Sequence, residues 1–293
     1  MQRRLALGIA AIVLAGALPA GALPAGAATV SRPGGAASPA LTATTVATGL
    51  ESTIALGGCS AALVRFPRSI GIDRALMLTN GHCYEGGMPA AGKVLQNVPS
   101  TRSGRLLDSA GNVLGTVQAD KLIYATMDNT DVALYQLTET FAALRVRLGA
   151  TALTISASHP TTGASITIPS GFWKRIWNCQ ITGFVPTLRE GQWTWHDSIR
   201  YDKACDIIGG TSGSPVVDVA TGKIVGINNT KNDNGAMCTF NNPCEVDGNG
   251  NTTVSKGQGY GQETYWFTTC LSRRNTIDLS VRGCLLPRPA AGV

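Results

Sequence analysis

Short runs of apolar residues that alternate with polar ones recur along most of the chain, and clusters of turn-forming residues separate them. Alternation with a period of two is typical of β-strands that bury one face. The intervening segments, such as residues 85–92 and 247–251, are rich in Gly, Pro, Asn and Asp. This pattern predicts an all-β protein of antiparallel sandwiches or barrels. Strands are expected around residues 61–66, 75–79, 113–119, 131–137, 164–168, 177–185, 192–202, 214–219, 223–229 and 265–269.

The β-rich region divides at a change of composition. Residues 145–153, RVRLGATAL, predict a seam between a first unit at 50–147 and a second unit at 148–284. A short helix is expected only near the C-terminus, around residues 269–284, and residues 285–293 are expected to be a tail.

Composition supports this fold class and narrows the range of partners. Charged residues make up only 14% of the chain, and 35 glycines accompany many Val, Thr and Ile residues. The net charge of +6 falls to +4 without Arg3 and Arg4, because 22 basic residues then face 18 acidic ones. The chain has no run of Lys and Arg, so no nucleic-acid partner is expected.

The first 27 residues carry the pattern of a secretory signal peptide. A basic MQRR precedes an uncharged apolar stretch at residues 5–20, and residues 25–27 give the small-residue spacing of a cleavage site. An uncleaved membrane anchor is the alternative, but Pro19 and Pro24 make a poor spanning helix. Residues 28–49 are expected to be a propeptide or a flexible arm. We therefore expect the mature protein to be secreted, extracellular and free of the membrane.

The number of cysteines fits an exported protein. An even number of cysteines in an oxidising compartment favours disulfides, and no CxxC pair indicates a metal site. Four disulfides and no metal are therefore expected. The eight cysteines are Cys59, Cys83, Cys179, Cys205, Cys238, Cys244, Cys270 and Cys284.

The first candidate catalytic residue is a histidine. A serine hydroxyl is a poor nucleophile at neutral pH and needs a neighbouring base, usually a histidine that a carboxylate orients. Only His82, His159 and His196 are available. His82 stands out because it ends the apolar run ALMLT in the segment LTNGHC, where the following cysteine can fix the turn.

A carboxylate and a serine complete the candidate set. Asp131 opens the alternating run DVALYQL, and Asp128, three residues earlier, is an alternative that spacing alone leaves open. Ser212 lies in GGTSGSPVV, where glycines on both sides allow backbone amides to converge on one point. Convergent amides are what an oxyanion hole requires.

Taken in this order, the three motifs resemble those of the chymotrypsin-like (trypsin-like) serine peptidases over about residues 50–285. LTNGHC is similar to that family's histidine motif, DVALYQL to its aspartate motif and GGTSGSP to its serine motif. The resemblance implies two packed antiparallel β-barrels of six strands each, with His82 and Asp131 in the first and Ser212 in the second. Ser214 makes the segment similar to the SGSP of bacterial glutamyl endopeptidases, which favours the bacterial exported branch.

The resemblance also implies a mechanism. Ser212 would be the nucleophile of a secreted serine endopeptidase, His82 its general base and then general acid, and Asp131 the group that holds the imidazole tautomer. The backbone N–H groups of Gly210 and Ser212 would form the oxyanion hole for an acyl-enzyme pathway. The implied partner is a peptide or protein substrate of a monomeric enzyme that needs no cofactor.

Three positions bear on activation and specificity. Thr211 stands where trypsin-type zymogens carry an aspartate that pairs with the freed N-terminal amine, so that ion pair is not expected here. Asp206 lies six residues before Ser212, where the trypsin branch has an aspartate at the floor of its pocket, but a loop aspartate is the favoured interpretation. Asn228 falls where glutamyl endopeptidases carry a histidine, which weakens an expectation of specificity for Glu.

The resemblance implies one disulfide directly, Cys59–Cys83, the family's histidine-loop bridge. A bridge between Cys270 and Cys284 would tie down the C-terminal segment. For the other four cysteines, Cys179–Cys205 with Cys238–Cys244 is favoured, and a bridge from Cys205 to Cys238 is the alternative.

Two other functions fit the sequence less well. A lipase or esterase elbow needs a glycine where Ser214 stands and a histidine after the nucleophile, and no histidine follows Ser212. A secreted binding or adhesion protein without catalytic activity is the remaining alternative, and the retention of all three candidate residues argues against it.

Overall fold

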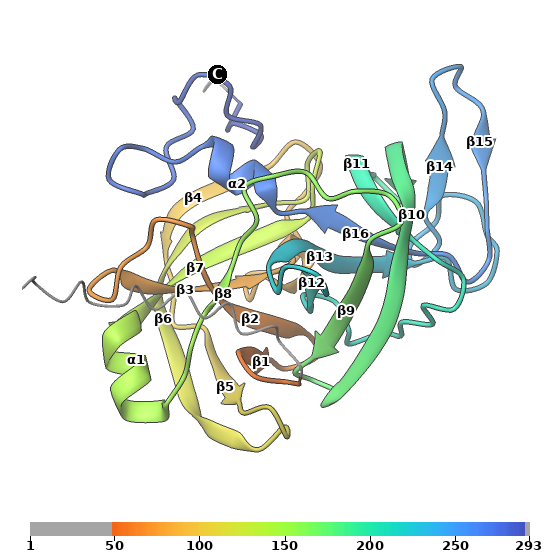
Figure 1. The fold of residues 1–293 in the computed structure, drawn as a ribbon. Coiled ribbons are helices and arrows are strands. Elements are labelled where there is room, and N and C mark those ends of the chain that lie inside the picture. The colour runs from red at the N-terminus through yellow and green to blue at the C-terminus, as the bar shows by residue number, and fades with distance from the viewer. Residues whose placement is uncertain (1–48, 291–293) are drawn as a thin grey trace, which may run out of the picture. The chain divides into compact units, whose positions relative to one another are not determined.

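The computed structural model describes residues 49–290. The predicted signal peptide at 1–27, almost all of the predicted arm at 28–49 and the end of the predicted tail lie outside the described residues. The described chain forms two rings of mainly antiparallel strands with three short helices (Figure 1). The predicted fold class is confirmed.

The first ring closes because β1 pairs with both β5 and β2. Its order is β1-β5-β6-β7-β3-β2, while β4 pairs with β6 and β8 adds a parallel strand beside β2. The bounds are β1 (Thr53–Ala55), β2 (Ser60–Arg65), β3 (Arg74–Thr79), β4 (Val94–Pro99), β5 (Ser103–Leu107), β6 (Val113–Thr126), β7 (Val132–Thr140) and β8 (Leu153–Thr154).

The second ring closes through the pairing of β10 with β11. Its order is β11-β16-β13-β12-β9-β10, and β14 and β15 extend the sheet beyond β10. The bounds are β9 (Ser165–Ser170), β10 (Arg175–Glu190), β11 (Trp193–Tyr201), β12 (Pro215–Asp218), β13 (Ile224–Lys231), β14 (Cys244–Val246), β15 (Thr252–Thr253) and β16 (Gly259–Glu263). The exact domain limits at 50–147 and 148–284 stay a prediction.

The helices differ from the sequence-based expectation. The sequence did not predict α1 (Phe141–Leu148), which lies where the seam was expected; Thr140 caps its first turn and Gly149, with φ 66°, ends it. The run expected as a strand at residues 265–269 instead forms α2 (Tyr265–Thr269). That strand prediction is wrong because the buried pair Trp266 and Phe267 packs into the core from a helical turn. Among residues 49–290, no helix has the length and apolar character needed to cross a bilayer.

One apolar cluster joins the two rings. It combines side chains of the first ring, such as Tyr124 and Leu134, with Val217 and Ile227 of the second. The ring of Phe267 in α2 meets that of Tyr124 edge to face, with centroids 6.2 Å apart. The two rings are therefore held together by a shared core that α2 completes.

All eight cysteines form disulfides, and the pairing is the one favoured from the sequence. The bridge Cys59–Cys83 links the start of β2 to the short helix η1 (Gly81–Cys83). The other bridges are Cys179–Cys205, Cys238–Cys244 and Cys270–Cys284.

Candidate active site

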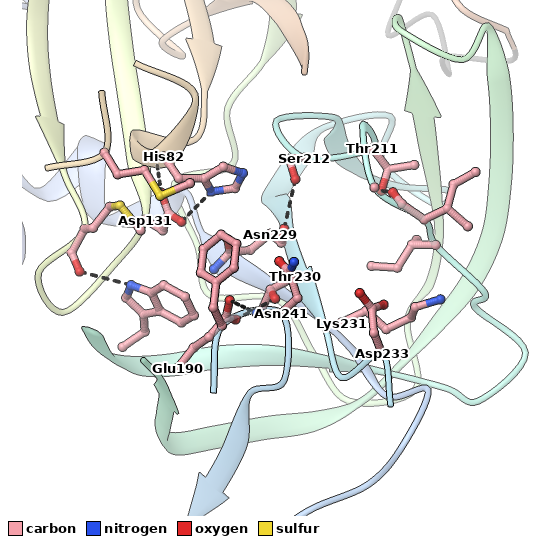
Figure 2. A pocket seen from close by; sticks show the side chains of 17 residues that line it. His82, Asp131, Glu190, Thr211, Ser212, Asn229, Thr230, Lys231, Asp233 and Asn241 are labelled. Atoms are coloured by element: carbon pink, nitrogen blue, oxygen red, sulfur yellow. Dashed lines mark hydrogen bonds and ion pairs between the residues drawn. The ribbon is translucent and has the colours of Figure 1, made fainter. Parts of the chain in front are cut away.

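One pocket brings together the three candidate residues from different parts of the chain. His82 and Asp131 reach it from the first ring, and Ser212 reaches it from the turn before β12. Figure 2 shows the imidazole of His82 facing the pocket across from the hydroxyl of Ser212. The two rings thus both contribute to the walls of this pocket.

Strand pairing explains why His82 and Asp131 meet. The end of β3 pairs with the start of β7, so η1 after β3 lies beside the residue that precedes β7. His82 Nδ1 donates to Asp131 Oδ2 at 2.7 Å, and the His82 backbone N–H donates to Asp131 Oδ1 at 2.9 Å. A Cβ at Gly81 would lie 2.1 Å from the carbonyl oxygen of Thr126, so only glycine allows this close approach.

The structure distinguishes between the two competing carboxylates. Asp131 is fully buried against His82, whereas the Asp128 carboxylate makes no ion pair or hydrogen bond to another residue of the described range; only the Asp128 backbone N–H donates, to Thr126 Oγ1. The segment between them is clamped onto the second ring, because Asn129 N–H donates to Thr194 O at 3.1 Å and His196 N–H donates to Asn129 O at 2.9 Å. Contacts with β11 therefore help to fix the position of Asp131.

The charge environment of His82 favours a basic imidazole. Burial by itself would lower the pKa of His82, because it disfavours the charged form. The charge of Asp131 and its hydrogen bond act in the opposite direction, and the charge of Glu190 adds to them. The net result raises the pKa of His82 above its ordinary value of 6.5.

The turn that carries Ser212 depends on two glycines with positive φ. Gly210 has φ 89° and Gly213 has φ 81°, a region that L side chains rarely adopt. A Cβ at Gly213 would lie 2.0 Å from the carbonyl oxygen of Ser60. The backbone N–H of Ser60 donates to Ser212 O at 2.8 Å, and Ser60 directly follows the bridged Cys59. One disulfide and one hydrogen bond thus connect the His82 loop to the Ser212 turn.

Two backbone amides in this turn have no acceptor in the described part of the chain. Thr211 N–H donates to Ile208 O and Gly213 N–H donates to Asn228 O, but the N–H groups of Gly210 and Ser212 make no such bond to residues 49–290. Unpaired backbone donors of this kind can bind an anion.

The Ser212 hydroxyl has a different partner in this conformation. Its Oγ donates to the backbone carbonyl of Asn229 at 3.2 Å, and no hydrogen bond within the described residues joins it to His82. Hydrogen bonds between catalytic groups are often long or unformed in ligand-free structures. In this conformation the Ser212 proton is therefore directed at Asn229 O and not at the imidazole.

Neutral hydrogen bonds hold Thr211, the residue that departs from the zymogen pattern. The Thr211 hydroxyl donates to Ile208 O at 2.6 Å and accepts from Asn228 Nδ2 at 3.0 Å. Thr211 and Asn228 are each 1% exposed. Asn228 therefore lies behind the turn and braces it, and it is not among the residues that line the pocket.

The remaining specificity candidate lies at the edge of the site. The Asp206 side chain is 81% exposed and accepts from Lys231 Nζ at 3.1 Å. Lys231 lines the pocket with Asp233 and Thr230, whereas Asp206 does not.

Sequence reasoning missed two acidic residues of the pocket, the exposed Asp233 and the buried Glu190. Glu190, at the end of β10, is 4% exposed and accepts from Thr230 Oγ1 at 2.6 Å and from the Asn241 N–H at 2.9 Å. Burial raises the pKa of Glu190, while these two hydrogen bonds and the His82 charge oppose that rise. The segment REGQ reads as an exposed turn, so only the fold, which brings Asn241 to it, reveals this carboxylate.

Comparison with known protein families identifies the family of this chain. The model of the trypsin-like peptidase domain family matches residues 68–227. The chain belongs to this family of trypsin-like peptidases. Its resemblance to chymotrypsin-like serine peptidases is thereby confirmed. No curated protein sequence matched the chain.

Several solved structures are similar in fold. The apo MamO protease domain from Magnetospirillum magneticum is 14% identical with a TM-score of 0.46, covering 74% of this chain and 93% of that one. The active form of the Rv3671c protease from M. tuberculosis is 15% identical with a TM-score of 0.45, covering 86% and 89%. Nocardiopsis protease is 15% identical with a TM-score of 0.41, covering 73% and 90%.

Proposed function

We propose that this trypsin-like peptidase is a secreted serine endopeptidase in which Ser212, His82 and Asp131 hydrolyse peptide bonds through an acyl-enzyme. The observation that carries the proposal is the 2.7 Å hydrogen bond from His82 Nδ1 to Asp131 Oδ2. Because an ionised carboxylate only accepts, this bond keeps the proton on Nδ1 and leaves the Nε2 lone pair for the pocket that contains Ser212.

The first half of the reaction forms the ester. Ser212 Oγ attacks the substrate carbonyl carbon while its proton passes to His82 Nε2, and the carbonyl electron pair moves onto oxygen. The free N–H groups of Gly210 and Ser212 are suited to bind that oxyanion. When the intermediate collapses, the C–N bond breaks and His82 returns the proton to the leaving amine.

The second half repeats these steps with water. His82 Nε2 removes a proton from a water molecule as the water oxygen attacks the ester carbon. Collapse of the second tetrahedral intermediate breaks the C–Oγ bond, and the same proton returns to Ser212. Throughout, the Asp131 carboxylate orients the imidazole and stabilises its charged form, which agrees with the raised pKa of His82.

Two further expectations remain part of the proposal. Four disulfides fit an extracellular or periplasmic protein, which supports export by the predicted signal peptide at 1–27. The neutral bonds of Thr211 support a Ser212 turn that forms without a charged N-terminal amine. The natural substrate would be a peptide or protein.

Cleavage of a diverse peptide library by the purified mature protein tests the proposal. Ser212→Ala should abolish cleavage. Ser214→Ala is the matched control, because Ser214 lies two residues away and its buried hydroxyl has no hydrogen-bond partner within residues 49–290. Cleavage that survives Ser212→Ala would refute the nucleophile. A wild-type protein that cleaves nothing and ignores serine-directed probes would favour the non-catalytic binding protein.

A further inference from the structure

A second cluster of a histidine and carboxylates lies outside the Ser212 pocket. His159 comes from the segment between β8 and β9, Asp197 from the middle of β11 and Glu263 from the end of β16. His159 Nε2 lies 3.2 Å from Asp197 Oδ2 and 3.4 Å from Glu263 Oε1. None of the three lines the pocket described above. They come from three distant segments with no motif spacing, so the sequence predicted no metal site.

The hydrogen bond at the other ring nitrogen leaves Nε2 facing the two acids. His159 Nδ1 donates to the Pro160 carbonyl at 2.6 Å, because a carbonyl can only accept. The ring is also held against Phe184 and Tyr265, with centroids 4.2 Å and 5.4 Å away. Metal-binding histidines commonly donate their second ring N–H to a backbone carbonyl in this way, which fixes the tautomer and the ring direction.

Glu263 is the independent sign that a ligand is needed. Glu263 is 2% exposed, and neither of its carboxylate oxygens has a hydrogen-bond partner within the described part of the chain. Buried polar groups are almost always partnered, and an isolated buried carboxylate is costly. The cluster therefore lacks positive charge at the point where the two acids meet the imidazole.

The two separations from His159 Nε2 fit one cation between the three groups, whose ligand atoms all lie within 4.8 Å of one another. Tetrahedral zinc with bonds of about 2.0–2.2 Å separates its ligand atoms by about 3.3–3.6 Å. The separations of 3.2 Å and 3.4 Å from Nε2 are close to this range. A proton on Nε2 would satisfy one carboxylate oxygen, and the Tyr265 hydroxyl donates to Asp197 Oδ2 at 3.5 Å. At least one oxygen of the buried Glu263 would still lack a partner within the described residues.

We propose that His159 Nε2, Asp197 and Glu263 bind a divalent cation of the zinc class. One imidazole with two carboxylates suits Zn²⁺, whereas Ca²⁺ and Mg²⁺ prefer oxygen ligands alone. The side chains of His159 and Asp197 are 37% and 34% exposed, so the cation can enter from solvent and keep a water ligand.

The expected role of the cation is structural. It would fasten the segment that connects the two rings to β11 and β16 of the second ring. Glu263 pairs with Gly226 of β13, so the cation would also help to hold β13, the strand that contains Asn229. Because the unfolded chain does not assemble these three ligands, binding should stabilise the folded protein, and the gain should rise with the logarithm of the free Zn²⁺ concentration above Kd.

Calorimetric titration of the chelator-treated mature protein with Zn²⁺, followed by thermal unfolding, tests this site. We expect one equivalent of Zn²⁺ to bind and to raise the unfolding temperature. His159→Gln and Glu263→Gln should each weaken binding by at least about 100-fold, more than the loss of an outer-shell partner. Glu139→Gln, which changes a carboxylate on β7, should bind Zn²⁺ as the wild type does.

Three results would overturn the site. The first is a wild-type protein whose unfolding temperature does not respond to Zn²⁺. The second is binding that survives both His159→Gln and Glu263→Gln, and the third is tighter binding of Ca²⁺ than of Zn²⁺. If Glu263→Gln does not fold, His159→Gln decides the question alone, because its partly exposed side chain tolerates the change.

Discussion

The chain contains two histidines that each lie against a carboxylate, and the difference between them concerns the nitrogen that the acid contacts. In the Ser212 pocket, Asp131 binds His82 at Nδ1, so Nε2 remains available to the pocket. In the cluster of His159, Asp197 and Glu263, the Pro160 carbonyl accepts from His159 Nδ1, and the two acids lie at Nε2.

This difference assigns different chemistry to the same side chain. An imidazole with a carboxylate behind it and a hydroxyl before it is suited to move a proton. An imidazole with a carbonyl behind it and two carboxylates before it is suited to bind a cation. The number of acids near a histidine is thus less informative than the ring atom they face.

The largest predicted effect tests the carboxylate behind His82. Asp131→Asn should lower kcat by about 10⁴, because an amide at this position favours the wrong imidazole tautomer. Asp128→Asn is the matched control and should keep turnover near the wild-type value. Steady-state kinetics on a cleaved peptide measure both, and circular dichroism checks the fold. A comparable loss in Asp128→Asn, with Asp131→Asn harmless, would show that the wrong carboxylate was chosen.

The second effect concerns the proposed oxyanion site beside His82. Gly210→Ala keeps the backbone N–H but should displace it from the oxyanion, which should lower kcat by up to about 10²–10³, the usual loss for one oxyanion donor. Its Cβ would lie 2.7 Å from the Phe172 ring, and φ 89° is strained for alanine. Gly209→Ala is the control, since a Cβ there meets no atom within 4 Å. Equal losses in both variants would argue against a specific role of the Gly210 amide.

A smaller effect, on stability, is expected for the Thr211 hydrogen bond behind the Ser212 turn. Thr211→Val keeps the shape of the side chain but leaves the buried Asn228 amide without its acceptor, which should cost about 1–3 kcal/mol of unfolding free energy. Denaturant unfolding measures this loss. Thr253→Val, on the exposed strand β15, should change stability by less than about 0.5 kcal/mol. Equal stability of Thr211→Val and wild type would mean that these neutral bonds do not hold the turn.

The smallest effect is a shift in pH dependence. The base must be neutral to act, so kcat/KM should rise as His82 loses its proton, at a pH above that of an ordinary histidine. Glu190→Gln removes a charge that raises the pKa of His82, so this rise should move to lower pH. The glutamine oxygen can still accept from the Asn241 N–H, and its NH2 group can donate to the Thr230 hydroxyl in place of the bond that Glu190 accepts. A shift to higher pH would contradict the electrostatic account.

The sequence predicted what local patterns encode. Alternating runs gave the all-β class, and LTNGHC, DVALYQL and GGTSGSP gave three residues that line one pocket. Residues 265–269 were expected to be a strand because their aromatic and β-branched composition favours one, but tertiary packing of Phe267 overrides that propensity.

The sequence could not predict contacts between distant segments. Glu190, at the end of β10, accepts a hydrogen bond from the Asn241 N–H, which is 51 residues away in the sequence. Its own segment, REGQ, reads as an exposed turn, so the sequence does not indicate this contact. His159, Asp197 and Glu263 likewise have no shared spacing. Burial and hydrogen-bond partners, which depend on the whole fold, identify both sites.

Covalent labelling tests the central claim most directly. The mature protein should form one adduct with a fluorophosphonate, and peptide mass mapping should locate it on Ser212. The labelling rate should rise with pH as His82 is deprotonated, and Ser212→Ala should prevent the reaction. An adduct on another residue, or peptide hydrolysis without labelling of Ser212, would contradict the assignment of Ser212 and His82 as nucleophile and base.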